Sequence, residues 1–319
     1  MKLGAFIVPT GIGASIGGFA GDASYWAREF ASIPDTKLIV NPNVVNAGCF
    51  SGITPNMFYV EGYSLDEFFK GNLYLNESNN NKIGVVFDKG ISQGILNVHI
   101  NTINAVKTIY GTDIIGWDIT DTPVGVEFFV DTSGISTGRV NNINTIFNSA
   151  QRLLKQGADA IAIVCKFGDY ECDDYANGIG VDPVGGVEAI ISHYISKELQ
   201  IPCAHSPAFE DIEIEQRIVD ARCSAEYITP TYLPCILLGL SQAPKLSKQE
   251  GYSINNLDYL IMPYNAIGSI PVFECNKRNI PIYAVKENKT VLNVTPEKLN
   301  LDINIVETYQ DVFQYFAIN

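Results

Sequence analysis

The feature that most constrains the fold is the alternation of short apolar runs with amphipathic segments. Residues 160–165 form a continuous apolar run, which is typical of a parallel strand buried on both faces. The apolar residues of the next patterned segment recur at helical spacing: Val187, Ile190, Ile191, Tyr194 and Ile195. Strands that alternate with helices of roughly 10 to 15 residues predict right-handed βαβ units and a parallel sheet.

The same pattern extends over most of the chain. Further strands are expected at 2–9, 37–40, 57–60, 83–87, 126–130, 201–204, 259–262 and 282–285, and helices at 23–30, 96–106, 143–154 and 268–278. The predicted fold is α/β, with mainly parallel sheets flanked by helices in a three-layer, Rossmann-like arrangement. A chain of 319 residues exceeds what one core usually fills, so two lobes are expected, 1–122 and 123–319, divided near Thr122-Pro123.

Charge and cysteine usage limit the partners and the compartment. The chain has 21 Lys and Arg against 35 Asp and Glu, a net charge of −14, which argues against a nucleic acid or an anionic membrane as partner. Its seven cysteines include no C-x-x-C pair, and the first apolar run ends at Pro9, short of a signal peptide. These features predict a reduced, cytoplasmic protein with a small-molecule partner, and they leave homo-oligomers open.

A glycine-rich loop follows the first expected strand, over residues 10–22. Such a loop lets backbone N–H groups converge on an anion at the start of the next helix. Its spacing matches neither a Rossmann nor a Walker motif. The alternative is a turn that only shapes the lobe. The candidate binding residues are Thr10, Gly11, Gly13, Ser15, Gly17 and Gly18.

Residues 131–139 form a second polar segment, after the apolar run 126–130. Arg139 can hold a carboxylate through two hydrogen bonds, and neighbouring hydroxyls can donate to the same group. The candidate binding residues are Ser133, Gly134, Thr137 and Arg139. The alternative is a helix cap by Ser136 or Asn141, with Arg139 in solvent.

A third loop, 166–186, collects acidic residues and a lysine. Lys166 ends a buried strand, where poor solvation can lower the pKa of an amine enough for proton transfer. Asp169 is the candidate acid, whereas Asp182 precedes Pro183 and suits a helix cap. Asp169, Asp173, Asp174 and Asp182 together leave a Mg²⁺ site as an alternative.

Of three histidines, His205 is the candidate for acid-base chemistry. It follows an expected strand and precedes Ser206-Pro207, at the sheet edge where α/β proteins bind ligands. Asn265 follows another strand at the same edge. His99 and His193 fall on expected helices and are interpreted as structural.

Several ordered motifs resemble an uncharacterised family, the domain of unknown function 3326. They are Val8-Pro9-Thr10-Gly11-Ile12-Gly13, the segment 17–22, Asn41-Pro42-Asn43-Val44, Tyr59-Val60-Glu61-Gly62-Tyr63 and Leu233-Pro234-Cys235. The resemblance runs over nearly the whole chain and implies no reaction or catalytic residues. It adds Asn41, Asn43 and Glu61 as candidate binding residues, because these polar residues also follow short apolar strands.

The residues together favour an enzyme of lyase, isomerase or hydrolase type. A cleft between two lobes would bind a small anionic metabolite, with a carboxylate or phosphate, and Lys166, Asp169 and His205 would move protons. No redox cofactor or metal is needed for such chemistry. Two alternatives remain: a non-catalytic metabolite-binding or scaffold protein, and a Mg²⁺-dependent enzyme that uses the 169–182 loop.

Overall fold

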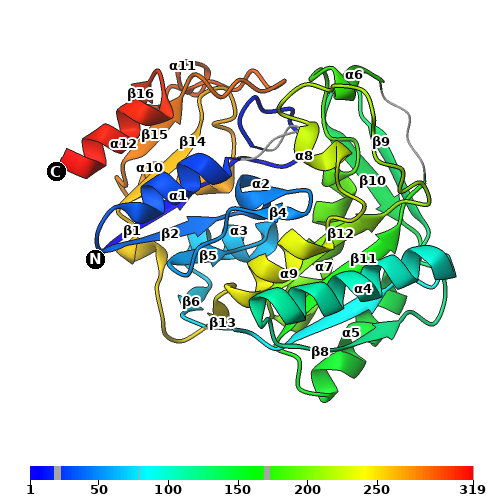
Figure 1. Ribbon diagram of the computed structural model, residues 1–319. Coiled ribbons are helices and arrows are strands. Elements are labelled where there is room, and N and C mark those ends of the chain that lie inside the picture. The colour runs from blue at the N-terminus through cyan, green and yellow to red at the C-terminus, as the bar shows by residue number, and fades with distance from the viewer. Residues whose placement is uncertain (18–22, 79, 169–172, 319) are drawn as a thin grey trace.

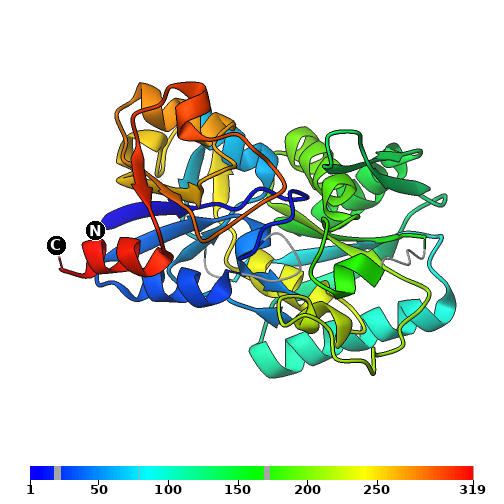
Figure 2. The ribbon, with the colours of Figure 1, turned by 90° about the horizontal axis from the view of Figure 1, so that it is seen from above.

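The computed structural model describes residues 1–17, 23–78, 80–168 and 173–318. It contains two parallel sheets, one on each side of the molecule (Figures 1 and 2). The large sheet has the order β16-β15-β14-β1-β2-β5, formed by β1 (Lys2–Phe6), β2 (Thr36–Val40), β5 (Met57–Tyr59), β14 (Tyr259–Pro263), β15 (Ile282–Val285) and β16 (Asn304–Val306). The small sheet has the order β12-β11-β7-β8, formed by β7 (Ile83–Phe87), β8 (Ile114–Ile119), β11 (Ala160–Lys166) and β12 (Cys203–Ala208).

Helices cover both faces of each sheet. On the large sheet, α1 (Ser24–Ser32) and α12 (Tyr309–Ile318) pack on one face, and α3 (Gly62–Lys70) and α10 (Ile270–Lys277) on the other. On the small sheet, α4 (Gln93–Tyr110) and α9 (Leu233–Ser241) lie opposite α5 (Ile143–Lys155) and α7 (Gly185–Leu199). The predicted three-layer α/β fold with mainly parallel sheets is confirmed.

Short elements complete the two lobes. Antiparallel pairs are formed by β3 (Asn46–Ala47) with β4 (Phe50–Ser51), β6 (Tyr74–Asn76) with β13 (Lys245–Ser247), and β9 (Val126–Val130) with β10 (Ser136–Val140). The short helices are α2 (Pro42–Val45), α6 (Asp173–Ala176), α8 (Ser224–Tyr227), α11 (Pro296–Leu299) and the 3₁₀ turn η1 (Ile254–Asn256).

The sheets divide the chain differently from the expected boundary at residue 122. β7 and β8 precede that boundary, yet they pair with β11 and β12 in the small sheet. The large sheet takes strands from both ends of the chain, because β14 pairs with β1. One lobe is therefore built from the two ends and the other from the middle of the chain. An apolar pattern locates strands but does not say which strands pair, so the sequence alone could not show this exchange.

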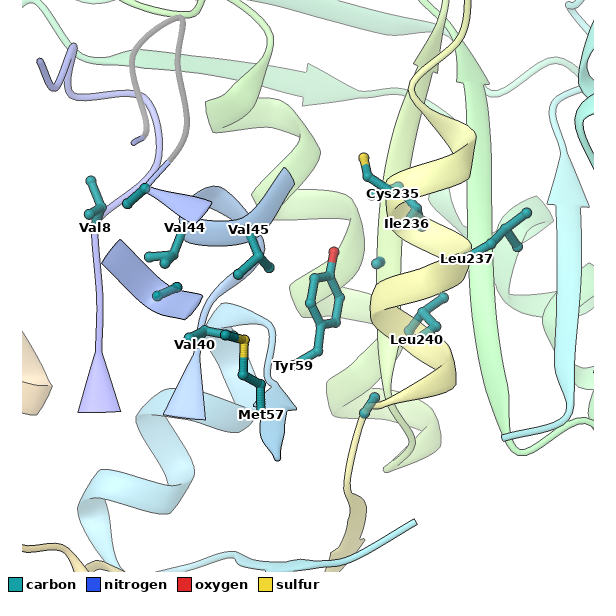
Figure 3. Close-up of a cluster of buried hydrophobic side chains, with 14 of the residues drawn as sticks. Val8, Val40, Val44, Val45, Met57, Tyr59, Cys235, Ile236, Leu237 and Leu240 are labelled. Atoms are coloured by element: carbon teal, nitrogen blue, oxygen red, sulfur yellow. The ribbon is translucent and has the colours of Figure 1, made fainter. Parts of the chain in front are cut away.

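A single apolar cluster, the shared core, joins the two sheets. It includes Phe6 and Tyr59 from the large sheet, Val85 from the small sheet, and Leu237 from α9. Figure 3 shows Tyr59 between Val45 and α9. Its ring packs directly on Gly239, where an added Cβ would lie 2.5 Å from a ring carbon. The two lobes are thus held together by close packing through α9.

Candidate functional site

A cleft of about 1450 Å³ opens between the two lobes. Its lining includes residues at or just after the carboxyl ends of β1, β2, β5 and β12, the edge where parallel α/β sheets bind ligands. The polar lining residues include Thr10, Asn41, Asn43, Glu61 and Asp66 from the large-sheet lobe and Asp182, Glu188, His193, His205, Glu226 and Tyr232 from the other.

The most distinctive contact in the cleft joins Glu188 to His205. Glu188 lies in the first turn of α7 and His205 in the middle of β12, and Nδ1 of the imidazole lies 3.0 Å from Oε1 of the carboxyl. The His205 side chain is only 1 % exposed, whereas that of Glu188 is 21 % exposed. A ligand in the cleft would therefore meet Glu188, with His205 behind it.

Burial shifts both groups toward their uncharged forms. It raises the pKa of Glu188 to about 8 and lowers the pKa of His205 to about 3. We assign the Nδ1–H tautomer to His205, because it then donates to Oε1 and leaves the proton of the carboxylic acid on Oε2. Within the described residues, Oε2 makes no hydrogen bond, so this proton is free for a ligand.

The neutral imidazole has an apolar neighbour. Its ring stacks on Phe167, with centroids 5.3 Å apart and planes inclined by 17°. Nε2 is buried and has no partner among the described residues, which in the assigned tautomer leaves a lone pair rather than an N–H group unsatisfied. The surroundings thus hold His205 as a neutral hydrogen-bond donor.

A second acidic group, Asp182, lies in the loop before α7. The N–H of Val184 donates to its Oδ1 over 3.0 Å. Burial and, next, the charge of Glu188 raise the pKa of Asp182 to about 7. The helix cap expected at this position is not formed, because Val184 is the N-cap residue of α7 and Asp182 lies two residues before it. The Asp182 carboxyl group also lines the cleft.

The charge of the cleft is negative. The described lining residues contain eight acids: Glu61, Asp66, Asp182, Glu188, Asp211, Glu213, Glu215 and Glu226. Arg217 is the single lysine or arginine of this described lining, and it pairs with Glu215 at 2.9 Å. A cleft lined by one sign of charge concentrates ligands of the opposite sign.

Lys166 ends β11 as expected, but its amine lies away from the cleft lining. Its Nζ forms an ion pair with Oε1 of Glu210 at 2.9 Å, and the side chain is 41 % exposed. Its backbone N–H donates to Oδ2 of Asp88, a buried residue whose Oδ1 accepts from Gly90 and Val124. The sequence did not predict this role of Asp88, whose carboxyl group accepts hydrogen bonds from three segments of the chain.

The glycine-rich loop brings Thr10 to the cleft and packs its glycines against the other lobe. Gly11 and Gly13 have φ of +73° and +58°, and added Cβ atoms would lie 2.4 Å from Ser136 Oγ and 2.3 Å from the carbonyl oxygen of Gly180. The hydroxyl of Ser15 bonds the backbone of Glu287 and Lys289. Gly17 also has a positive φ, whereas Gly18 lies outside the described residues. This geometry is that of a turn that shapes the lobe.

Residues 131–139 belong to the β9–β10 hairpin rather than to a loop after a parallel strand. Ser133 bonds Asp131 within the turn, and Gly134 adopts φ of +83° there. Thr137 pairs with Phe129, and Arg139 is exposed opposite Glu127. Of these predicted binding residues, the structure brings none into the described lining of the cleft.

The remaining candidates have structural partners. Asn43 lines the cleft, and its Nδ2 donates to the carbonyls of Val8 and Pro9. Glu61 also lines it, but both carboxyl oxygens cap α3 by accepting from Tyr63 and Ser64. The Asn265 amide bonds the 290–292 loop and is not part of the described lining.

Asp169 lies outside the described residues. Within the described part of the chain, no group of three or more His, Cys, Asp and Glu is arranged to hold a metal ion.

Glu188 is a candidate that the sequence did not predict, because apolar spacing alone does not single out an acidic residue within 187–199. The available signal was an acid in the first turn of a helix that starts at the ligand edge.

The fold and the cleft define an α/β protein with acidic side chains between two parallel-sheet lobes. The chain belongs to the family described as protein of unknown function DUF3326, which matches residues 4–317 and confirms the expected family. It is 38 % identical over 320 residues to an uncharacterised lipoprotein of a Synechococcus species, with 98 % of this chain and 89 % of the relative covered. No solved structure matches the chain.

The relative corrects the expected location. Its name describes a lipoprotein, which contradicts the cytoplasmic location inferred from the cysteines and the first apolar run. That prediction is wrong, because scattered cysteines indicate a compartment only by their statistics. Among the described helices, none has the length and apolarity that crossing a bilayer requires.

Proposed function

We propose that this protein is a non-redox enzyme of the lyase, isomerase or hydrolase type, in which Glu188 transfers a proton to or from a small metabolite in the cleft. The observation that carries the proposal is the 3.0 Å contact between Glu188 Oε1 and His205 Nδ1, with Glu188 facing the cleft. A carboxyl group with a pKa of about 8 holds a proton at neutral pH and can release it during a reaction.

The acidic lining supports a different substrate charge from the one that the sequence predicts. Eight acids surround the cleft, and the single arginine of the described lining is paired. A carboxylate or phosphate would be repelled there, whereas a neutral, hydroxyl-bearing or amine-bearing metabolite would find hydrogen-bond acceptors. We therefore propose an uncharged or positively charged substrate.

The first experiment identifies the ligand. Thermal unfolding is followed in the presence of small metabolites grouped as cationic, neutral and anionic. Cationic or neutral compounds are expected to raise the unfolding temperature, because a ligand that binds only the folded state stabilises it. A rise confined to anionic compounds would contradict the proposed substrate charge.

The second experiment tests catalysis by Glu188 on the compound so found. Glu188→Gln keeps the shape of the side chain but removes its titratable proton, and we expect turnover to fall by about 10² to 10⁴-fold. Glu198→Gln, on an exposed position of the same helix, is the matched control and should retain turnover. Full turnover by Glu188→Gln, or recovery of unchanged ligand from the wild-type protein after days, would reject the enzyme in favour of a binding protein.

A further inference from the structure

The inference drawn here deepens the proposed function and rests on it. We propose that Asp182 is the second catalytic residue of the cleft, and that it takes a proton from one position of the substrate while Glu188 delivers a proton to another. The chemistry would be an isomerisation or an elimination, in which the substrate loses one proton and gains one.

The position of Asp182 is built by its surroundings. Its Oδ1 accepts from Val184 N–H, which fixes the carboxyl group at the start of α7. Its Oδ2 lies against Gly185, where an added Cβ would come within 2.7 Å of that oxygen. The same Cβ would lie 2.7 Å from Cγ2 of Thr10, which comes from the opposite lobe. The absence of a side chain at 185 thus leaves room for Asp182 where the two lobes meet.

Asp182 and Glu188 share the cleft and interact electrostatically. Both line it, and the charge of Glu188 contributes to raising the pKa of Asp182. Two carboxyl groups that repel one another and titrate at about 7 and about 8 are not both ionised at neutral pH. One carboxylate and one carboxylic acid in the same cleft are what combined base and acid catalysis requires.

Burial holds several titratable groups near the pair in their neutral forms. Tyr175 and Tyr232 interact with Asp182, and Cys235 with Glu188, and burial raises the pKa of each. His205 is neutral because burial lowers its pKa. Asp88 also interacts electrostatically with His205. Glu226 also lines the cleft, and its Oε2 accepts from the Tyr175 hydroxyl over 2.7 Å. We assign the proton exchange to Asp182 and Glu188 because both lie at the start of α7.

The proposed step is balanced. The Asp182 carboxylate removes a proton from the substrate, and the electron pair of the broken bond moves within the substrate. The Glu188 carboxylic acid protonates the receiving atom, which is a second carbon in an isomerisation or a departing hydroxyl group in an elimination. After product release, a proton passes from Asp182 to Glu188 through solvent, which restores both groups without an oxidant or reductant.

The interaction between the two groups can be tested without a substrate. Carboxyl carbon chemical shifts are followed by NMR from pH 4 to 10 in the wild type, in Asp182→Asn and in the surface control Asp302→Asn. We expect Asp182→Asn to lower the apparent pKa of Glu188, because Asp182 ionises at a lower pH and is negatively charged while Glu188 titrates. Asp302→Asn should leave it unchanged. A Glu188 titration that is the same in all three proteins would overturn the inference.

The catalytic role is tested on the compound identified above. We expect Asp182→Asn to lower turnover by about 10²-fold or more and to remove the acidic limb of the pH profile. Asp302→Asn, at an exposed position far along the chain, controls for the loss of a carboxylate. If Asp182→Asn keeps full turnover while Glu188→Gln loses it, this inference fails and the proposed function stands. If both variants keep full turnover, the proposed function itself fails.

Discussion

In the proposed function, His205 acts through Glu188 rather than on a ligand. Its side chain is 1 % exposed, its ring lies on Phe167, and its Nδ1 faces the Glu188 carboxyl group. The sequence predicted His205 after the end of a strand and in a proton-transfer role, whereas the structure places it in the middle of β12, and we propose that role for Glu188. Spacing along a chain cannot show which of two packed side chains faces a cleft. We therefore treat His205 as a positioning residue.

A substitution of His205 should change the titration of Glu188. His205→Phe fills the space but removes the Nδ1–H donor, so the Glu188 carboxylate loses a hydrogen bond and its pKa should rise above about 8. His205→Gln can supply an N–H group and should restore part of the original value. Carboxyl NMR titration measures both shifts. The assigned role would be wrong if Phe and Gln at this position gave the same Glu188 titration as the wild type.

At the scale of elements, apolar periodicity predicted the buried strands well and the hairpin poorly. The strand at 160–165 is fully buried between two helix layers, as its continuous apolar run predicted. β9 is different, because its residues are mostly exposed and its partner is the following β10. The turn signal Asp131-Thr132-Ser133-Gly134 between two short runs was available and would have indicated a hairpin.

The contact between α9 and β5 gives a prediction about helix packing. Gly239→Ala places a Cβ 2.5 Å from the buried Tyr59 ring, and neither group can move freely in the shared core. We expect a loss of about 1 to 3 kcal/mol in the free energy of unfolding. Gly94→Ala is the matched control, because it lies in α4 with nothing within 4 Å of the added Cβ. It should be neutral or slightly stabilising.

Chemical denaturation of the two alanine variants measures the difference. Equal stability of Gly239→Ala and Gly94→Ala would mean that α9 and Tyr59 are not packed as closely as described.

Among the described residues, one apolar cluster, the shared core, crosses between the two lobes. Because the shared core includes strands of both sheets and α9, neither lobe can lose its packing without exposing part of the other. Calorimetry should therefore show one unfolding transition, with equal calorimetric and van't Hoff enthalpies. Leu237→Ala should shift that single transition to lower temperature without splitting it. Two resolved transitions in the wild type would contradict the shared core.

Protons held in the cleft should also make stability depend on pH. The folded protein keeps protons on Asp182 and Glu188 up to pH of about 7 and about 8, whereas the unfolded chain releases them near 3.8 and 4.5. The free energy of unfolding from these groups therefore falls as pH rises toward 8. His205 has the opposite effect on the free energy of unfolding, because its pKa is lowered from 6.5 to about 3. Its contribution rises with pH between about 3 and 6.5 and stays constant above about pH 6.5.

Between pH 6.5 and 8 only Asp182 and Glu188, of these three groups, change the free energy of unfolding, which should therefore decline as pH rises. Glu188→Gln should flatten the decline by at most about 1.4 kcal/mol per pH unit, the effect of one proton. Denaturant unfolding at several pH values, with Glu198→Gln as control, measures the slope. Identical slopes for wild type and Glu188→Gln would show that Glu188 does not keep its proton in the folded state.

The pairing of β1 with β14 has a consequence for how the chain is made. Gly4 lies beside Tyr259, so β1 leaves the ribosome long before β14 and cannot pair with it until that later strand has been synthesised. The small sheet is complete much earlier, when Ala208 has emerged. The middle of the chain can thus begin to fold during translation. The large sheet, and with it the cleft, is completed only when β14 has been synthesised and pairs with β1.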